Sequence, residues 1–224
     1  GDGSKEKASA DSTTTTAETT TPVIEPVNTI VTTPENMMIV QHKVADFAKW
    51  KMSYEEHDSM RLAHGIHSYV LGRGVQDSNM VLVVVKADDV AKAKAFAKDP
   101  SLKKAMQKGG VTGAPTISFV TATWQDTANI GAVPRSLTSF TVKDWDAWQK
   151  SFDDGKQERI DNGLTVRVVG HDADDNKKVS LVTALMDTAK ASAYWKSDML
   201  KKRREAGGVL TEPKRFVFRM VHRY

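Results

Sequence analysis

The stretch VADFAKW at residues 44–50 recurs as VKDWDAW at residues 142–148, 98 residues further along the chain. The alignment of residues 44–120 with residues 142–218 needs no gap, and 24 of its 77 pairs are identical. The identical pairs include Gly-Gly-Val at 109–111 and 207–209, and Pro115 with Pro213. A repeat this long corresponds to a small domain, since solenoid units span roughly 20–50 residues. The fold problem therefore reduces to one small unit that occurs twice.

Local signals predict the order β-α-β-β-α-β in each copy. The apolar residues 37–44 favour a strand, and Asp46 and Asp144 are suitable N-caps for the helices that follow. Those helices are expected to end at Gly65 and Gly163. A unit of this order is ferredoxin-like, with helices on one face of its sheet and a bare second face. We therefore predict an α+β protein in which two tandem ferredoxin-like (βαββαβ) repeats form an intrachain dimeric α/β barrel, a monomer with an internal pseudo-dimer.

The domain boundaries follow from this repeat and from the composition of the N-terminal segment. Residues 1–35 contain ten Thr and only scattered apolar residues, too few to offset the entropy of ordering. We predict a disordered Thr/Pro-rich tether at 1–35, a first repeat at 36–122, a linker at 123–133 and a second repeat at 134–224.

The start of the chain resembles the segment that follows the lipidated cysteine of bacterial lipoproteins. This resemblance predicts an extracytoplasmic location, in the periplasm or at the cell surface, with a lipid anchor attached upstream of Gly1. A cytosolic N-terminal extension and a secreted protein with an unlipidated tail are the alternatives.

The composition narrows the function. The 32 basic and 28 acidic residues are interspersed, which argues against a nucleic-acid partner. The chain has no Cys, so disulfides, thiol nucleophiles and thiolate metal ligands are excluded. No apolar run approaches the ~20 residues that a transmembrane helix needs. We find no dinucleotide, P-loop or zinc-protease motif, and we predict no cofactor.

The repeated motifs carry a family resemblance. Val-x-Asp-aromatic-x-x-Trp at 44–50 and 142–148, the Asp-rich turns near Asp77 and Asp175, and Gly-Val-x-x-x-Pro at 110–115 and 208–213 are similar to the dimeric α/β-barrel superfamily. Within it they resemble the antibiotic-biosynthesis-monooxygenase-like branch. The resemblance covers both repeats. It implies the barrel fold, and it leaves activity open among cofactor-free monooxygenases, haem-degrading or haem-dependent enzymes, isomerases and ligand binders.

The candidate site follows from alternation along the second strand of each copy. We expect Val70, Gly72, Val168 and Gly170 to face the helices, so that the other set faces the cavity between the sheets. His42, in the strand at 37–44, joins this set if it shares the same face. The predicted ligand-binding residues are His42, His67, Tyr69, Arg73, Arg167 and His171.

Two functions remain open at this stage. The first is an extracytoplasmic module that binds a small, partly apolar anionic ligand, which the two Arg could pair. The alternative is a cofactor-independent monooxygenase-like, or haem-handling, enzyme that uses one of these residues as a base in a dry cavity. The same residues could instead be rim groups that bond to one another. His57, His64 and His67 match no metal-ligand spacing, so we predict no metal site. Arg61 and Arg159 are expected to pair with the neighbouring acidic residues 55–56 and 153–154.

Overall fold

The computed structural model describes residues 28–224. The first half contains β1 (Ile30–Val31), β2 (Glu35–Val44), α1 (Phe47–Glu56), α2 (Asp58–Ala63), β3 (Ile66–Gly74), β4 (Met80–Ala87), α3 (Val90–Ala97), α4 (Pro100–Lys108) and β5 (Val111–Asp126). The second half contains β6 (Arg135–Thr141), α5 (Trp145–Asp154), α6 (Lys156–Asp161), β7 (Leu164–Asp172), β8 (Lys178–Leu185), α7 (Thr188–Trp195), α8 (Asp198–Ala206) and β9 (Lys214–Arg223). The predicted α+β class is confirmed.

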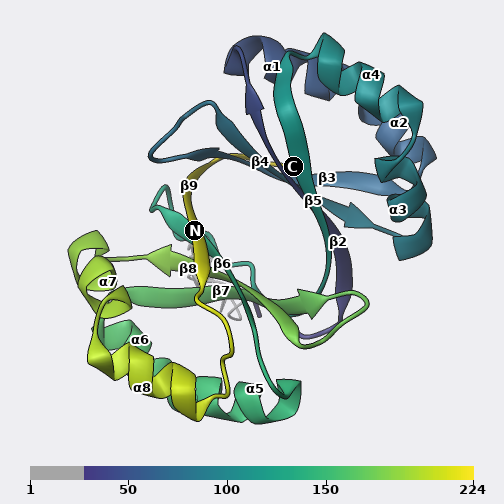
Figure 1. Cartoon of the computed structure of the whole chain (residues 1–224). Helices are drawn as coiled ribbons and strands as arrows, with labels where there is room; N and C mark the ends of the chain where they lie inside the picture. The colour runs from purple at the N-terminus through teal and green to yellow at the C-terminus, as the bar shows by residue number, and fades with distance from the viewer. Residues whose placement is uncertain (1–27) are drawn as a thin grey trace, which may run out of the picture.

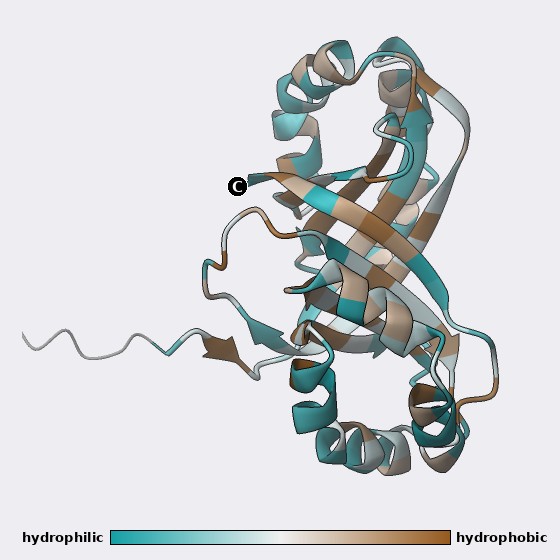
Figure 2. Ribbon diagram, turned by 90° about the vertical axis from the view of Figure 1, so that its left-hand side faces the viewer, coloured by the Kyte–Doolittle hydropathy of each residue, from teal (hydrophilic) through white to brown (hydrophobic). Residues whose placement is uncertain are grey.

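The strands form one antiparallel sheet in the order β1-β5-β2-β4-β3-β9-β6-β8-β7, and β5 also pairs with β7. That last pairing closes the sheet into a barrel (Figure 1). The five strands of the first half stay together, as do the four of the second, and the halves meet at two junctions, β3–β9 and β5–β7. Each set of helices covers the outside of its own strands, on opposite sides of the barrel (Figure 2).

The helices of the two halves have matching bounds. α1 begins at residue 47 and α5 at residue 145, an offset of 98, and α2, α3 and α4 match α6, α7 and α8 with the same offset. As predicted, Asp46 and Asp144 cap their helices by accepting from the amides of Lys49 and Ala147. The predicted single helix is divided in each half, at residues 57 and 155.

The predicted tether and linker both differ from the structure at one end. Residues 1–27 lie outside the described residues, but β1 pairs with β5, and the Thr29 hydroxyl donates to Asp126 at 2.9 Å. The last part of the segment predicted to be disordered therefore belongs to the fold. β5 continues to Asp126, so the connection between the halves begins at residue 127. Within the described residues, no helix is long and apolar enough to cross a membrane.

Two glycines permit the close contacts at the junctions. A Cβ on Gly72 would lie 2.7 Å from Phe218 Cδ2 across β3–β9, and a Cβ on Gly170 would lie 2.7 Å from the Thr121 carbonyl oxygen across β7–β5. Such distances are shorter than van der Waals contact, so only glycine fits here without a shift of the neighbouring strand. The sequence predicts that Gly72 and Gly170 face the helices, and this is wrong. A Cβ on either would point toward residues of the other half that line the barrel cavity, Phe218 and Val120.

The recurring arginines act on the backbone rather than on acidic neighbours. Arg61 donates to the Tyr54 carbonyl at 2.6 Å and lies 3.6 Å above the Tyr54 ring. Arg159 donates to the Phe152 carbonyl at 2.6 Å and lies 3.6 Å above that ring. The predicted pairing with residues 55–56 and 153–154 is wrong: the carboxylate that Arg61 does reach, at 3.7 Å, is Asp58. Each arginine thus links its own helix, α2 or α6, to the helix before it, α1 or α5, across the break.

Candidate functional site

A β-bulge in each half changes which residues face the barrel. The pairing of β3 with β4 shifts between Ser68 and Val70, and that of β7 with β8 shifts at the equivalent place around Arg167. An extra residue reverses the alternation of faces beyond it. Tyr69 and Val70 therefore both line the barrel interior, whereas Leu71 belongs to the core under the helices.

The bulges separate the six predicted site residues. Tyr69 and Arg167 line one cavity inside the barrel, as predicted. Arg73 points to the helix side, with its guanidinium 4.1 Å above the Phe47 ring. His171 packs edge-on against Trp145, also on the helix side, and His67 pairs with a surface carboxylate at 3.0 Å. The prediction that Arg73 and His171 face the cavity is wrong, because it assumed unbroken alternation past the bulges. The prediction for His67 is also wrong: this residue precedes the bulge, and its side chain lies at the exposed start of β3 beside Asp88.

His42 lies in a different pocket, between the sheet and helices α1, α2 and α4 of the first half. We call this the His42 pocket; besides His42 it is lined by Met38, Val40, Trp50, Ser53, Tyr54, His57, Met60, Arg61, Val83, Val85, Phe96, Leu102, Ala105 and Met106. Its volume is about 60 Å³. The walls are largely apolar, and the His42 ring packs edge-on against Trp50 with the centroids 5.4 Å apart.

The buried imidazole of His42 gives this pocket a group that can bond to a ligand or take up a proton. The side chain is 4% exposed, and its Nδ1 has no hydrogen-bond partner among the described residues. Burial lowers the pKa of His42, because a charged imidazolium loses its hydration there. The ring is therefore neutral near pH 7, and a neutral imidazole can accept a proton or a hydrogen bond.

The equivalent pocket of the second half, about 90 Å³ in volume, has a different chemistry. Phe140 replaces His42, and Phe140 packs on Trp148 as His42 packs on Trp50. Tyr194 and Arg203 in this second pocket both donate to Glu158, at 2.5 Å and 2.7 Å. Arg159 Nε and Arg215 Nε also line it and are buried without a partner among the described residues, but a guanidinium nitrogen can only donate. The available acceptor is thus confined to the first half.

The other histidines of the first half each have a partner of their own. His57 lines the His42 pocket, but its Nδ1 lies 2.6 Å from the Ser53 carbonyl oxygen. His64 Nδ1 lies 2.8 Å from the Met60 carbonyl oxygen. From residue 28 onward, no three His, Asp or Glu side chains come together as metal ligands.

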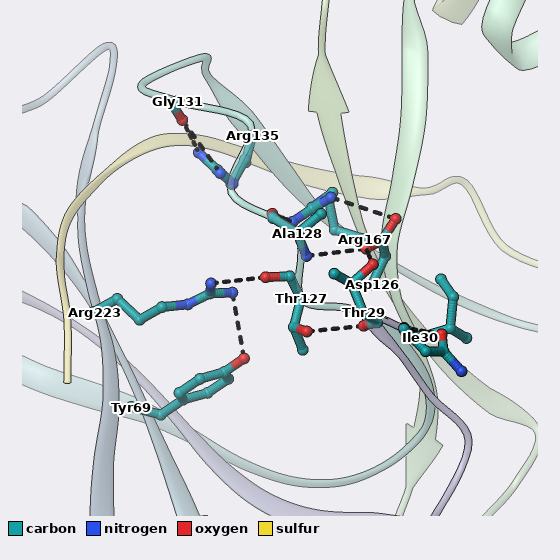
Figure 3. Close-up of polar contacts among 11 residues, drawn as sticks. Thr29, Ile30, Tyr69, Asp126, Thr127, Ala128, Gly131, Arg135, Arg167 and Arg223 are labelled. Atoms are coloured by element: carbon teal, nitrogen blue, oxygen red, sulfur yellow. Dashed lines mark hydrogen bonds and ion pairs between the residues drawn. The ribbon is translucent and has the colours of Figure 1, made fainter. Parts of the chain in front are cut away.

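The barrel cavity has a volume of about 80 Å³ and is closed at one end by polar groups (Figure 3). Three arginines from three strands gather there: Arg135 from β6, Arg167 from β7 and Arg223 from β9. Arg135 and Arg167 are buried, with 6% and 5% of their surface exposed. Gln125 and Asp126 join them from the end of β5. The remaining wall is apolar.

These arginines are held mainly by the connection between the halves. Arg135 donates to the Val133 carbonyl at 2.9 Å, Arg223 to the Thr127 carbonyl at 3.2 Å, and Arg167 to the Ala128 carbonyl. Burial lowers the pKa of Arg135, and the charges of Arg167 and Arg223 lower it further. The three cations therefore repel one another at short range.

Sequence reasoning missed Arg135, Arg223, Gln125 and Asp126 at the barrel end. Arg135 is the first residue of β6 and Arg223 the last of β9, and only closure of the barrel brings them beside β7. Nothing in their local sequence distinguishes them from other strand-end residues. Arg167 alone could be found from the sequence, because it alternates with Val168 and Gly170 along the predicted strand.

Comparisons with known proteins give similarity at the level of the fold. No family model matches the chain, and no curated protein does. A provisionally named monooxygenase from Fusobacterium nucleatum subsp. nucleatum superposes with a TM-score of 0.54 and 13% identity, covering 84% of this chain and 93% of that one. An anthrone oxidase-like protein has a TM-score of 0.55 and 16% identity, covering 86% and 94%. A provisionally named chlorite dismutase has a TM-score of 0.53 and 12% identity, covering 85% and 96%.

The chain has their fold. This likeness agrees with the barrel architecture that the repeated motifs predict. Identities this low carry the architecture and not the activity. Function must therefore be argued from the cavities themselves.

Proposed function

We propose that the His42 pocket binds a small, largely apolar molecule that donates a hydrogen bond to Nδ1 of His42. The observation that carries this proposal is a nitrogen buried with no partner beside a space that a ligand could fill. A buried polar atom without a partner costs about 1–3 kcal/mol, and a ligand donor would recover part of that cost. Apolar walls with one placed polar group are typical of small-molecule sites.

The second candidate is an oxygenase reaction in the same pocket. The neutral imidazole favours it, because such a ring can remove the proton of an acidic phenol or enol in a site that excludes water. The resulting anion can pass an electron to dioxygen without a cofactor. The names of two fold neighbours, a provisionally named monooxygenase and an anthrone oxidase-like protein, are consistent with this reaction. His42 would then hold the proton on Nδ1 while the substrate reacts.

A haem group does not fit the cavities described above, and the two larger clefts, of about 540 and 710 Å³, are lined in the described part of the chain by no His, Cys, Met or Tyr that could ligate its iron. The His42 pocket and its counterpart measure about 60 and 90 Å³, a small fraction of the volume of a tetrapyrrole. The barrel cavity is equally small, at about 80 Å³. We therefore derive no step through haem.

The binding proposal is tested by NMR on the full chain with ¹⁵N-labelled histidine. Phenol, a small aromatic donor, should shift the His42 Nδ1 resonance, whereas toluene, which lacks the donor, should shift it less. The control is His42→Phe, the residue that the second half carries at this place and accommodates. Equal phenol binding by wild type and His42→Phe would refute the proposal.

The oxygenase candidate is tested by oxygen uptake with hydroquinone, a single-ring phenol close in size to the binding probe, as the substrate. His42→Phe should abolish uptake by the full chain. Phenol binding that depends on His42, without any oxygen uptake, would instead favour the ligand-binding module as the function.

Two further properties remain proposals. We infer that the halves are tandem ferredoxin-like repeats that arose by duplication; the shared 98-residue offset of the helices and the matching arginine contacts support this. Extracytoplasmic location and a lipid anchor rest on the Thr/Pro-rich composition of the N-terminal residues. Cell fractionation with labelled palmitate tests both, and unlabelled protein in the cytosol would contradict them.

A further inference from the structure

We propose that the arginine end of the barrel cavity is a second binding site, for a short-chain hydroxycarboxylate. Arg135, Arg167 and Arg223 would bind the carboxylate (Figure 3). Gln125 would accept from the hydroxyl, and the apolar wall of the barrel would hold the short chain. This site lies inside the barrel and is separate from the His42 pocket, which lies outside it under the helices.

The first argument is charge. Among the three guanidinium groups, Arg167 lies near a carboxylate: Asp126 Oδ2 is 3.7 Å from Arg167 Nη1. The other oxygen of Asp126, Oδ1, accepts from the Thr29 hydroxyl at 2.9 Å and the Ala128 amide at 3.0 Å. Three cations against one anion leave an excess of two positive charges in a place where two of the arginines are almost completely buried. A bound monoanion would reduce that excess.

The second argument is the weakness of the present partners. Apart from Asp126, the arginines donate to main-chain carbonyls of residues 127–133 and, from Arg223 at 3.5 Å, to the Tyr69 hydroxyl. These acceptors are neutral. A carboxylate accepts shorter and stronger hydrogen bonds from guanidinium groups than a carbonyl does, and it can accept two in parallel. An entering carboxylate would therefore compete well for these donors.

The third argument comes from Gln125 and gives the ligand its hydroxyl. Gln125 is 2% exposed, and its Nε2 donates to Glu35 Oε2 at 3.0 Å, which orients the amide. Its Oε1 is left buried without a donor. A simple carboxylate has no donor to give, whereas a hydroxycarboxylate satisfies the arginines with one end and Gln125 with its hydroxyl.

The fourth argument is size. The cavity of about 80 Å³ is far below the ~300 Å³ at which pockets for drug-sized ligands begin. Its wall is built from aliphatic and aromatic side chains that include Leu82, Leu137 and Phe218. A chain of a few carbons fits such a space, and a long acyl chain does not.

The experiment titrates the full chain with 3-hydroxybutyrate by isothermal titration calorimetry. Butyrate lacks the hydroxyl, and butane-1,3-diol lacks the carboxylate; both should bind at least about tenfold more weakly, since each loses hydrogen bonds to buried groups. Absence of 3-hydroxybutyrate binding at millimolar concentration, or equal binding of butyrate, would overturn the proposal.

Two arginines of β9 provide a matched pair of variants. Arg223 and Arg219 are both exposed and both donate to the connection between the halves, at 3.2 Å to Thr127 and 3.1 Å to Ala132, but only Arg223 lines the cavity. Arg223→Met should weaken binding by about tenfold or more, and Arg219→Met should leave it unchanged. Equal losses would mean that the arginines only fasten the connection. His42→Phe should not affect this binding, so failure here is distinguishable from failure of the proposed function.

Discussion

Replacement of His42 by Phe should stabilise the protein, and the gain should grow as the pH falls. In the wild type, His42 Nδ1 is buried without a partner, which costs about 1–3 kcal/mol. Phe removes that polar atom and can extend into the adjoining space of about 60 Å³. Phe140 occupies the equivalent place in the second half, with its ring centroid 5.6 Å from that of Trp148. We expect a gain of about 1–2 kcal/mol in the free energy of unfolding at pH 7.5.

The pH dependence follows from the lowered pKa of His42. Below 6.5, the ordinary pKa of histidine, the unfolded chain takes up a proton at this residue, while the folded chain, with its lower pKa, does not. The unfolded state then binds more protons, so wild-type stability falls with decreasing pH, by at most about 1.4 kcal/mol per pH unit for one group. The loss continues until the pH reaches the folded-state pKa. The His42→Phe variant has no imidazole at this position, so its stability lacks this dependence on pH.

Urea denaturation followed by circular dichroism at pH 7.5 and pH 5.0 measures both effects in the full chain. The difference between variant and wild type should be positive at pH 7.5 and larger at pH 5.0. A His42→Phe protein that is less stable at both values, or a difference that does not change with pH, would refute the reasoning. The reverse substitution, Phe140→His, should destabilise by about 1–3 kcal/mol, since it creates a new buried imidazole.

Three other predictions concern the stability of the fold. Gly170→Ala should lower the free energy of unfolding by about 1–3 kcal/mol and by more than Gly72→Ala, because the added Cβ meets a backbone oxygen rather than a ring; comparable chemical denaturation curves would contradict this. Glu158→Gln should flatten the stability profile at acid pH, since the bond from Arg203 holds the pKa of Glu158 below 4.5 and that stabilisation is lost as the pH falls through the lowered value; an unchanged profile in urea melts would count against it. A chain that begins at residue 36 should melt at a lower temperature than one that begins at residue 28, because it lacks β1 and the bond from Thr29 to Asp126; identical calorimetric midpoints would disprove it.

Much of the fold could be predicted from the sequence because it depends on local signals. Asp46 and Asp144 act as caps through their own side chains, and Trp50 and Trp148 are 4% and 3% exposed, as residues on the apolar stripe of a helix should be. Each of these features depends on residues within one turn or one face. The alignment of the two copies adds equal element lengths, which the helix bounds follow.

The orientation of the candidate site could not be predicted in the same way. A bulge is defined by the partner strand, because two residues on one strand oppose one on the other. The extra residue is Tyr69 in one copy and Arg167 in the other. These residues are 98 positions apart, so the two bulges leave no gap or insertion in the alignment of the copies. A comparison of the copies therefore cannot reveal it, and alternation carried past it assigns Arg73 and His171 to the wrong face.

The differences between the copies place different unpartnered groups in the two pockets. Glu158, Tyr194 and Arg203 bond to one another in the second half, where the first half has Met60, Phe96 and Ala105. The unpartnered buried atoms that line the second pocket are Arg159 Nε and Arg215 Nε, which can only donate a hydrogen bond. In the first half, His42 Nδ1 is an unpartnered buried atom that can accept a proton or a hydrogen bond. A ligand that donates a hydrogen bond therefore gains most at His42, although the two pockets lie at equivalent places of one fold.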